Sequence, residues 1–402
     1  SLLCKTFRCL YSTIQRKTIR YVGETLQKHV AALQGIPTRS VDISKLEAHT
    51  MNESRDSAVI PLGSEPQIRL QYINFTELVR FGKLLEDLDT FAIWLSYKHN
   101  QGGNLMGFPR HHPMMIVTAA VDEIHIKPDY DILPTTDIIM EGHVSWVGRS
   151  SLEVSMHLSQ EIQGSRRDFL SAKFITVSRE PSGDRSTPNV PLKTTSPEEE
   201  KMVRKGLAAR EIRKLNEERS LMKTPPNDEE RHILHNLFLQ TIDPQSYSFR
   251  HRVLPPNHVW IEDAKLKNAV LCFPVDRNVY NKIFGGYLMR LAFELAWCNA
   301  AMYAKGRVKI AAVDDILFRK SVEIGSLLLL SSQVCYTVGN RMELSVNAEV
   351  LNVVTDTRVS TNTFYFMFKA EHDVPSIVPR SYADGMLFVE AKRHYESSEN
   401  RL

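Results

Sequence analysis

The chain has 402 residues, 43% hydrophobic and 24% charged, a balance that is typical of globular proteins and excludes a largely disordered or fibrous chain. Its 50 basic and 47 acidic side chains leave a formal net charge of +3, which is too small to indicate nucleic-acid binding by bulk attraction. No apolar run approaches the roughly 18–20 residues that cross a bilayer, so we expect no membrane span. Five scattered cysteines without a Cys-x-x-Cys pair indicate reduced thiols and no cysteine metal site.

The N-terminal segment differs in charge from the rest of the chain. Residues 1–23 carry five basic side chains and no acid, with apolar and hydroxyl residues between them. A basic, acid-free, amphipathic leader is typical of a mitochondrial transit peptide, which is removed after import. We therefore assign residues 1–30 to such a leader and expect the mature protein in the mitochondrial matrix. A basic tail on a cytosolic protein is the alternative.

The rest of the chain contains an internal repeat. The sequence Ala-Ala-Val-Asp-Glu-Ile at 119–124 recurs as Ala-Ala-Val-Asp-Asp-Ile at 311–316, an offset of 192 residues. Both copies continue with an alternating run, at 152–158 and 342–350, and end in a further apolar run, at 173–178 and 363–368. Alternation with a period of two predicts antiparallel strands with one buried face. The collinear order indicates a duplicated domain.

Each copy also has one long helix before these strands. Apolar residues recur at spacings of three and four over 84–95, which predicts a helix with one buried face. The second helix, from residue 286 to about residue 301, is apolar nearly all round, which indicates that a sheet wraps it.

Between the copies, charged helices are expected at 198–219 and 228–240. His232 and His235 lie one turn apart there without a third ligand, so no metal site is expected. The predicted fold class is α+β, with two helix-plus-antiparallel-sheet domains. The expected parts are a leader at 1–30, a first domain at 55–182, a helical linker at 183–250, a second domain at 251–385 and a C-terminal tail at 386–402.

The second long helix opens on a pair of glycines, Gly285 and Gly286. The first N–H groups of a helix have no partner inside it and carry the positive end of the helix dipole. Such donors suit a carbonyl oxygen that becomes negative in a transition state. Close packing of another backbone is the alternative reason for two glycines.

The stretch that contains Pro274, Asp276, Asn278 and the run Ile283-Phe284-Gly285-Gly286 resembles the signature of hot-dog-fold acyl-CoA thioesterases. In that fold, one helix is wrapped by an antiparallel sheet. Two such domains behind a basic leader resemble the mitochondrial double hot-dog branch, over about residues 55 to 385. The resemblance implies a tandem hot-dog fold, hydrolysis of acyl-CoA to a free carboxylic acid and coenzyme A, and no cofactor.

The family pairs an Asn seven residues before the first motif glycine with an Asp seven residues after the second, taken from two different hot-dog units. In the second domain Asn278 matches the Asn position, but Phe293 stands at the Asp position. In the first domain Asp89 matches the Asp position, seven residues after Gly82, and Asn74 stands at the Asn position. The resemblance implies one composite site, formed by Asn278 and Asp89, and a reciprocal pair that lacks its acid.

By resemblance, Asp89 either activates a water as general base or attacks the thioester carbonyl itself, and both routes stay open. Asn278 would hold the water or the carbonyl, and the N–H of Gly286 would bind the oxyanion. The residues expected to border the substrate are those of the glycine motifs, namely Phe284, Gly285 and Gly82.

Some residues have alternative roles. Asp89 could be an ordinary solvated helix residue, and Glu86, one turn earlier on the same face, is then the substitute base. Glu294 either pairs with Arg290, four residues earlier, or serves a weaker second site. Basic residues near strand ends are candidates for the CoA phosphates, namely Arg149, Arg319 and Lys320.

Two other functions are weighed against hydrolysis. Phe293 and Phe81, where an acid and a glycine are expected, favour a catalytically decayed acyl-CoA-binding or scaffold protein. A hot-dog hydratase is disfavoured because neither central helix has a histidine between its glycine and the seventh residue after it. The resemblance also implies a homo-oligomer, with a trimer of double units imitating a hexamer of single domains.

Overall fold

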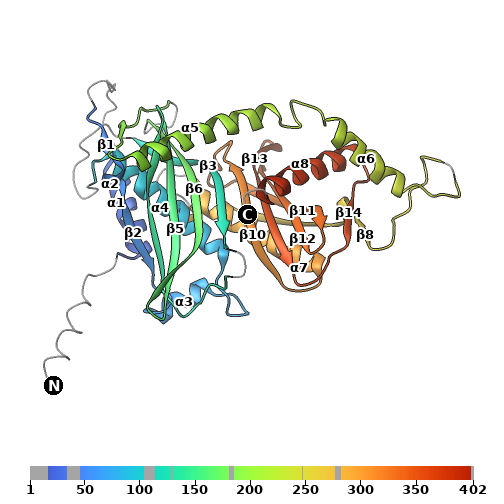
Figure 1. Ribbon diagram of the computed structural model, residues 1–402, viewed down its shortest axis with the longest axis horizontal. Coiled ribbons are helices and arrows are strands. Elements are labelled where there is room, and N and C mark those ends of the chain that lie inside the picture. The colour runs from blue at the N-terminus through green and yellow to red at the C-terminus, as the bar shows by residue number, and fades with distance from the viewer. Residues whose placement is uncertain are drawn as a thin grey trace, which may run out of the picture.

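The computed structural model describes residues 17–33, 46–103, 114–127, 130–180, 185–246, 248–276 and 282–399, without the side chains of residues 123 and 315. It contains two similar halves, in each of which an antiparallel sheet wraps one long helix (Figure 1). This arrangement confirms the predicted α+β class and the tandem hot-dog architecture.

The strands of the two halves join into one continuous ten-stranded sheet, ordered β2-β4-β5-β6-β3-β10-β13-β12-β11-β9. The order of the second half repeats that of the first in reverse, so the junction of β3 and β10 lies at the centre. There the strands pair antiparallel, with Val313 opposite Ile124. The strands in sheet order are β2 (Asp56–Ile60), β4 (Ile138–Val147), β5 (Ser151–Ile162), β6 (Ser165–Arg179), β3 (Met115–Ile126), β10 (Val308–Leu317), β13 (Thr357–Ala370), β12 (Arg341–Asn352), β11 (Leu327–Val338) and β9 (Lys265–Leu271).

The expected alternation is visible in the burial of these strands. Leu152, Val154, Met156 and Leu158 of β5 are fully buried, as are the corresponding apolar residues of β12 from Met342 to Ala348. Each large apolar side chain removed from water contributes about 1.5–3 kcal/mol. The alternating runs therefore hold the sheet against the two central helices.

The two central helices, α4 (Phe81–Asn100) and α7 (Gly285–Ala304), pack against each other in antiparallel directions. A Cβ added to Gly286 would lie 2.9 Å from the Cα of Glu86, and one added to Gly82 would lie 3.1 Å from the Cγ of Arg290. Only glycine leaves room for helices this close. The glycines therefore set the contact between the two domains.

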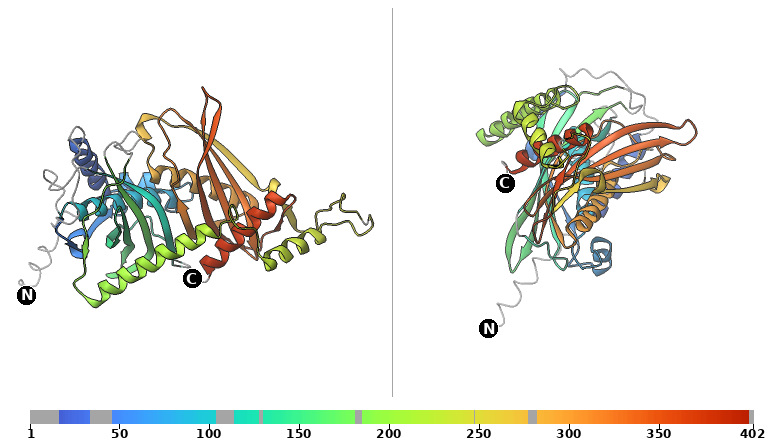
Figure 2. Two further views of the ribbon diagram at one scale, coloured as in Figure 1. Left: turned by 90° about the horizontal axis from the view of Figure 1, so that it is seen from above. Right: turned by 90° about the vertical axis from the view of Figure 1, so that its right-hand side faces the viewer.

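The charged linker folds largely as predicted, into α5 (Pro197–Glu218) and α6 (Asp228–Gln240). The Ser196 side chain caps α5 and the Asn227 side chain caps α6, each accepting a backbone N–H of the first turn. α5 packs on β4, where Gly206 lies against Trp146. The segment expected as a C-terminal tail contributes to α8 (Tyr382–Glu399), which covers the second half. Both α5 and α8 lie on the outer face of the sheet, away from α4 and α7 (Figure 2).

The N-terminal helix α1 (Ile19–Leu33) packs on α4 and β2. Val22 and Val30 are buried in the core, and the Lys17 ammonium contacts the Asp56 carboxylate at 2.5 Å. This packed chain overlaps the leader that the sequence predicted at residues 1–30. Residues 1–16 lie outside the described part of the chain.

The remaining elements are short. β1 pairs with β7 and β8 pairs with β14, both in parallel, so packed structure of the first half extends beyond 55–182 at both ends. None of the helices within the described ranges is long and apolar enough to cross a membrane. The short elements are β1 (His49–Thr50), α2 (Met51–Ser54), α3 (Pro66–Tyr72), β7 (Leu192–Lys193), β8 (His258–Trp260), η2 (Ile261–Asp263), η3 (Pro274–Asp276) and β14 (Ser376–Val378).

Candidate active site

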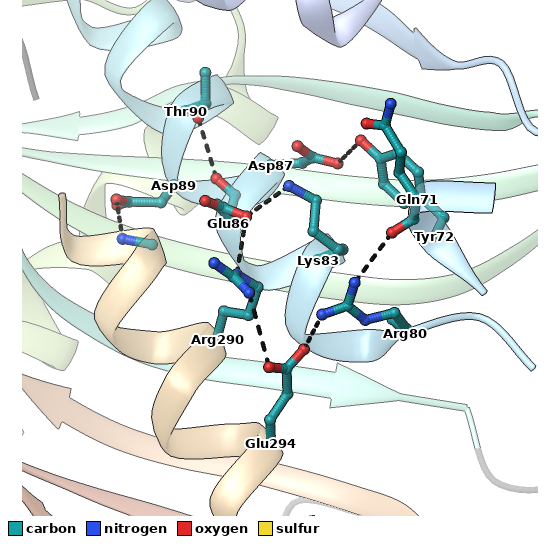
Figure 3. A network of polar contacts seen from close by, with 11 residues as sticks. Gln71, Tyr72, Arg80, Lys83, Glu86, Asp87, Asp89, Thr90, Arg290 and Glu294 are labelled. Atoms are coloured by element: carbon teal, nitrogen blue, oxygen red, sulfur yellow. Dashed lines mark hydrogen bonds and ion pairs between the residues drawn. The ribbon is translucent and has the colours of Figure 1, made fainter. Parts of the chain in front are cut away.

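Asp89 lies at the point where α4 of the first domain meets the start of α7 of the second. Its Oδ2 accepts a hydrogen bond of 2.6 Å from the N–H of Gly286 (Figure 3), and its Oδ1 accepts one from the hydroxyl of Thr118 on β3. Gly286 is the second residue of α7, so its N–H is one of the donors that the helix itself leaves unpaired. The carboxylate thus lies at the positive end of a helix from the other domain.

The environment of Asp89 changes its acidity. The side chain is only 1% exposed. Burial raises its pKa to about 6, and this rise outweighs the hydrogen bonds from Thr118 and Gly286, which favour the ionised form. A carboxyl group of this kind is ionised at neutral pH and is a stronger base than an ordinary aspartate. These are the properties that a general base near neutral pH requires.

A cavity of about 1270 Å³ reaches Asp89, a volume large enough for an extended ligand. Both halves of the chain contribute apolar and charged residues to its lining. The apolar lining residues of the first half include Ile19, Leu26 and Val30 of α1, Ile93 of α4 and Ile116 of β3, and its cationic lining residues are Arg20, Lys83 and Arg179. The cationic lining residues of the second domain are Lys282, Arg290, Arg319 and Lys320.

The expected substrate-binding residues divide into two groups. Phe284 and Gly285 line the cavity. Gly82 and Arg149 do not belong to the cavity lining. Gly82 packs against Arg290, and the backbone carbonyl of Arg149 accepts a hydrogen bond from the N–H of Asn189. Asn278 lies outside the described residues, so its expected pairing with Asp89 stays a prediction.

Glu86, the substitute base, lines the cavity but is held by two cations. Its carboxylate contacts Lys83 at 2.6 Å and Arg290 at 3.2 Å. The guanidinium of Arg290 also contacts the carboxylate of Glu294 at 3.7 Å, and Glu294 forms a second ion pair with Arg80. Figure 3 shows these groups as one chain of alternating charge between the two helices. Both glutamates therefore serve the contact between α4 and α7.

The reciprocal position is apolar. Phe293 packs against Phe81 with ring centroids 5.1 Å apart, and also contacts the rings of Phe366 and Phe368. Asn74, its expected partner, uses its Oδ1 to accept the backbone N–H groups of Thr76 and Leu78 within its own turn. The reciprocal pair therefore offers no carboxylate.

Two polar residues of the cavity were missed by the sequence analysis. Thr118 bonds to Asp89, and it directly precedes the repeated 119–124 segment, but a single sequence does not show which strand residue faces a helix. Asp87 accepts a hydrogen bond of 2.6 Å from the Tyr72 hydroxyl, and burial raises its pKa to about 7. Both residues line the cavity.

Within the described ranges, no group of three or more His, Cys, Asp or Glu side chains could hold a metal ion. His232 and His235 of α6 therefore have no such set around them.

Comparison with known proteins gives relatives that match over most of the chain. No family model matches the chain. It is 42% identical over 352 residues to "Acyl-coenzyme A thioesterase 9, mitochondrial" of Bos taurus, covering 88% of this chain and 79% of that protein, and the Homo sapiens protein of that name gives the same figures. A solved acyl-CoA hydrolase from Staphylococcus aureus is 25% identical, covers 36% of this chain and 92% of its own, and has a TM-score of 0.35. On this identity over 352 residues, the chain belongs to the acyl-coenzyme A thioesterase 9 family of thioester hydrolases.

Proposed function

We propose that this protein hydrolyses acyl-CoA to a free carboxylic acid and coenzyme A at one composite site. The observation that carries the proposal is the buried Asp89 carboxylate of the first domain, which lies in the cavity and accepts the Gly286 N–H of the second. A buried carboxylate with a raised pKa beside unpaired helix N–H donors supplies both a base and an oxyanion donor.

The chemistry needs a rearrangement of one hydrogen bond. In the structure the Gly286 N–H is used by Asp89. When the thioester binds, its carbonyl oxygen would take the place of Oδ2 at this N–H, and the carboxylate would rotate so that Oδ2 is free to take a proton from a water. The water oxygen then attacks the carbonyl carbon, the C–S bond breaks, and the thiolate of coenzyme A receives the proton. Asn278 is the proposed second ligand of the water or carbonyl, and direct attack by Asp89 is the alternative route.

The composition of the cavity supports an orientation for the substrate. Arg319 and Lys320 line it next to Phe318, which is 3.4 Å from where a Cβ of Gly285 would lie. They are therefore better candidates for the CoA phosphates than Arg149, which is not part of the lining. The apolar lining residues of α1, α4 and β3 suit the acyl chain.

The relatives' names and the leader composition support a mitochondrial protein, and we propose the matrix as its compartment. A leader cleaved at residue 30 would remove most of α1, whose Val22 and Val30 are buried. We therefore propose that cleavage, where it occurs, precedes Lys17. N-terminal sequencing of the protein isolated from mitochondria tests this, and a mature N-terminus after Lys17 would contradict it.

Assembly into a homo-oligomer also belongs to the proposal, with a trimer as the expected form. Analytical ultracentrifugation of the purified protein measures the mass directly. A monomer at micromolar concentration would contradict the expectation.

Release of free thiol from acetyl-, octanoyl- and palmitoyl-CoA tests the activity. The Asp89→Asn enzyme should lose about 10²–10⁴-fold in kcat, whereas Asn74→Ala should retain the parent rate. A fully active Asp89→Asn enzyme would overturn the composite site. The rival function, a decayed binding protein, predicts that the parent binds CoA esters but releases no thiol.

A further inference from the structure

Helix α1 lies outside the repeated part of the chain, yet it forms one wall of the cavity. It runs parallel to α4, because Gly23 lies beside Thr90 and the His29 ring contacts the Tyr97 ring at 5.2 Å. The residues of α1 that line the cavity recur at helical spacing and so share one face, namely Ile19, Arg20, Gly23, Leu26, Gln27 and Val30.

The cavity-lining face of α1 carries buried apolar and exposed polar residues. Ile19, Leu26 and Val30 are buried, whereas Arg20 and Gln27 are exposed. Ile93 of α4 and Ile116 of β3 add to the apolar part of the lining. Thr90, which lies beside Gly23, directly follows Asp89 in α4, and both residues line the same cavity.

Gly23 leaves the cavity open at this place. A Cβ added there would lie 3.9 Å from the Cγ2 of Thr90, and apart from the neighbouring residues and backbone of α1 itself no other non-hydrogen atom of the described chain lies within 4 Å of it. A methyl group therefore fits, and a longer side chain would extend into the cavity. Glycine inside a helix is less favourable than alanine. We attribute its presence here to the open space that it leaves in the cavity.

We propose that α1 forms the wall of the acyl channel and that Gly23 sets how long an acyl chain the enzyme accepts. The inference rests on the proposed hydrolysis of acyl-CoA and adds the residue that selects the substrate within that class. Each methylene that leaves water changes binding by roughly fourfold. A side chain that takes the place of three or four methylenes should therefore lower kcat/KM for long chains by about 10²-fold.

The test compares Gly23→Leu with Ala32→Leu. Ala32 is exposed and lies nine residues further along α1, on the opposite side of the helix, so it receives the same added side chain outside the cavity. Both variants replace a small residue in a helix by a good helix former, and thermal unfolding checks that both are folded. The measured quantity is kcat/KM for the shortest and the longest acyl-CoA that the parent hydrolyses.

The expected result is a loss of about 10²-fold for the longest substrate in Gly23→Leu, with the shortest within about threefold of the parent and Ala32→Leu unchanged for both. An unchanged length profile in Gly23→Leu, or an equal loss for both substrates, would overturn the role of α1 while leaving the hydrolysis proposal intact. A parent that hydrolyses no acyl-CoA would overturn both.

Discussion

The contact between α4 and α7 has two equivalent ends, and they are built from opposite chemistry. At one end Asp89, seven residues after Gly82, accepts the N–H of Gly286 beside the cavity. At the other end Phe293, seven residues after Gly286, packs against the ring of Phe81. Both ends keep a glycine that lets the helices approach, but only one keeps a carboxylate. One end thus offers a buried carboxylate beside the cavity, and the other contributes apolar packing.

The middle of the same contact shows what duplication allows. Glu86 and Arg290 each stand four residues after their glycine, so they occupy equivalent positions, and they pair at 3.2 Å. Two identical chains would bring like charges together at such positions, which is destabilising. A duplicated chain can place a glutamate opposite an arginine. The two halves have therefore diverged into complementary surfaces.

The largest effect is expected at the apolar end, from Phe293→Asp. The change replaces a buried ring by a carboxylate among Phe81, Phe366 and Phe368, which removes packing and buries an unpaired charge. The free energy of unfolding should fall by about 3–5 kcal/mol, measured by denaturant titration, with no gain in thiol release. A stable variant with increased turnover would show instead that the second end retains a latent site.

The pH dependence of activity distinguishes the two buried aspartates of α4. If Asp89 is the base, kcat/KM should fall about tenfold for each pH unit below about 6. If this decrease began near pH 7 instead, it would indicate that Asp87 is the base. The Asp87→Asn enzyme should keep the decrease that begins near pH 6. The pKa of Asp89 is raised to about 6 in the folded protein, so its contribution to the free energy of unfolding decreases as the pH rises from about 4 to about 6. The Asp89→Asn protein should therefore become more stable relative to the parent as the pH rises over that range.

A smaller effect is expected from Glu343→Gln on β12. Burial, with the nearby charge of Asp314, raises the pKa of Glu343 well above its usual range, so ionisation opposes folding increasingly as pH rises above about 4.5. The glutamine should raise the free energy of unfolding by about 1–3 kcal/mol at pH 8. Glu153, at the equivalent place in the first half, accepts the Ser145 hydroxyl at 2.8 Å. Glu153→Gln should therefore gain less, and equal gains would show that the Ser145 bond contributes little.

The smallest effect is expected from the ion pair at the centre of the contact. A double-mutant cycle with Glu86→Gln and Arg290→Met should give a coupling energy of about 0.5–1 kcal/mol, since both side chains are about one-fifth exposed. The coupling should decrease in high salt. A coupling energy of zero would show that this ion pair does not stabilise the contact between α4 and α7, and that close packing at the glycines stabilises it instead.

Much of this architecture could be predicted because it depends on short-range patterns. The alternation over 152–158 and 342–350 predicted β5 and β12, and the spacing of three and four over 84–95 predicted α4. The resemblance implied a composite site of Asp89 with Asn278 and Gly286, and the structure brings Asp89 to the N–H of Gly286, whereas Asn278 lies outside the described residues. Thr118, Tyr72 and Asp87 could not be predicted as neighbours of the cavity, because their contacts depend on strand register and on which side of α4 meets each element.

The N-terminal segment shows most clearly which properties the sequence determines by itself and which depend on the tertiary structure. Its basic, amphipathic composition by itself indicates a leader, and the repeat, the two central helices and the missing acid at Phe293 are likewise properties of the sequence. Only the tertiary structure decided that residues 17–33 pack on α4, that both halves of the chain line one cavity, and that burial raises the pKa of Asp89. These depend on residues far apart in the chain sharing one low-dielectric space, and local composition carries no record of that proximity.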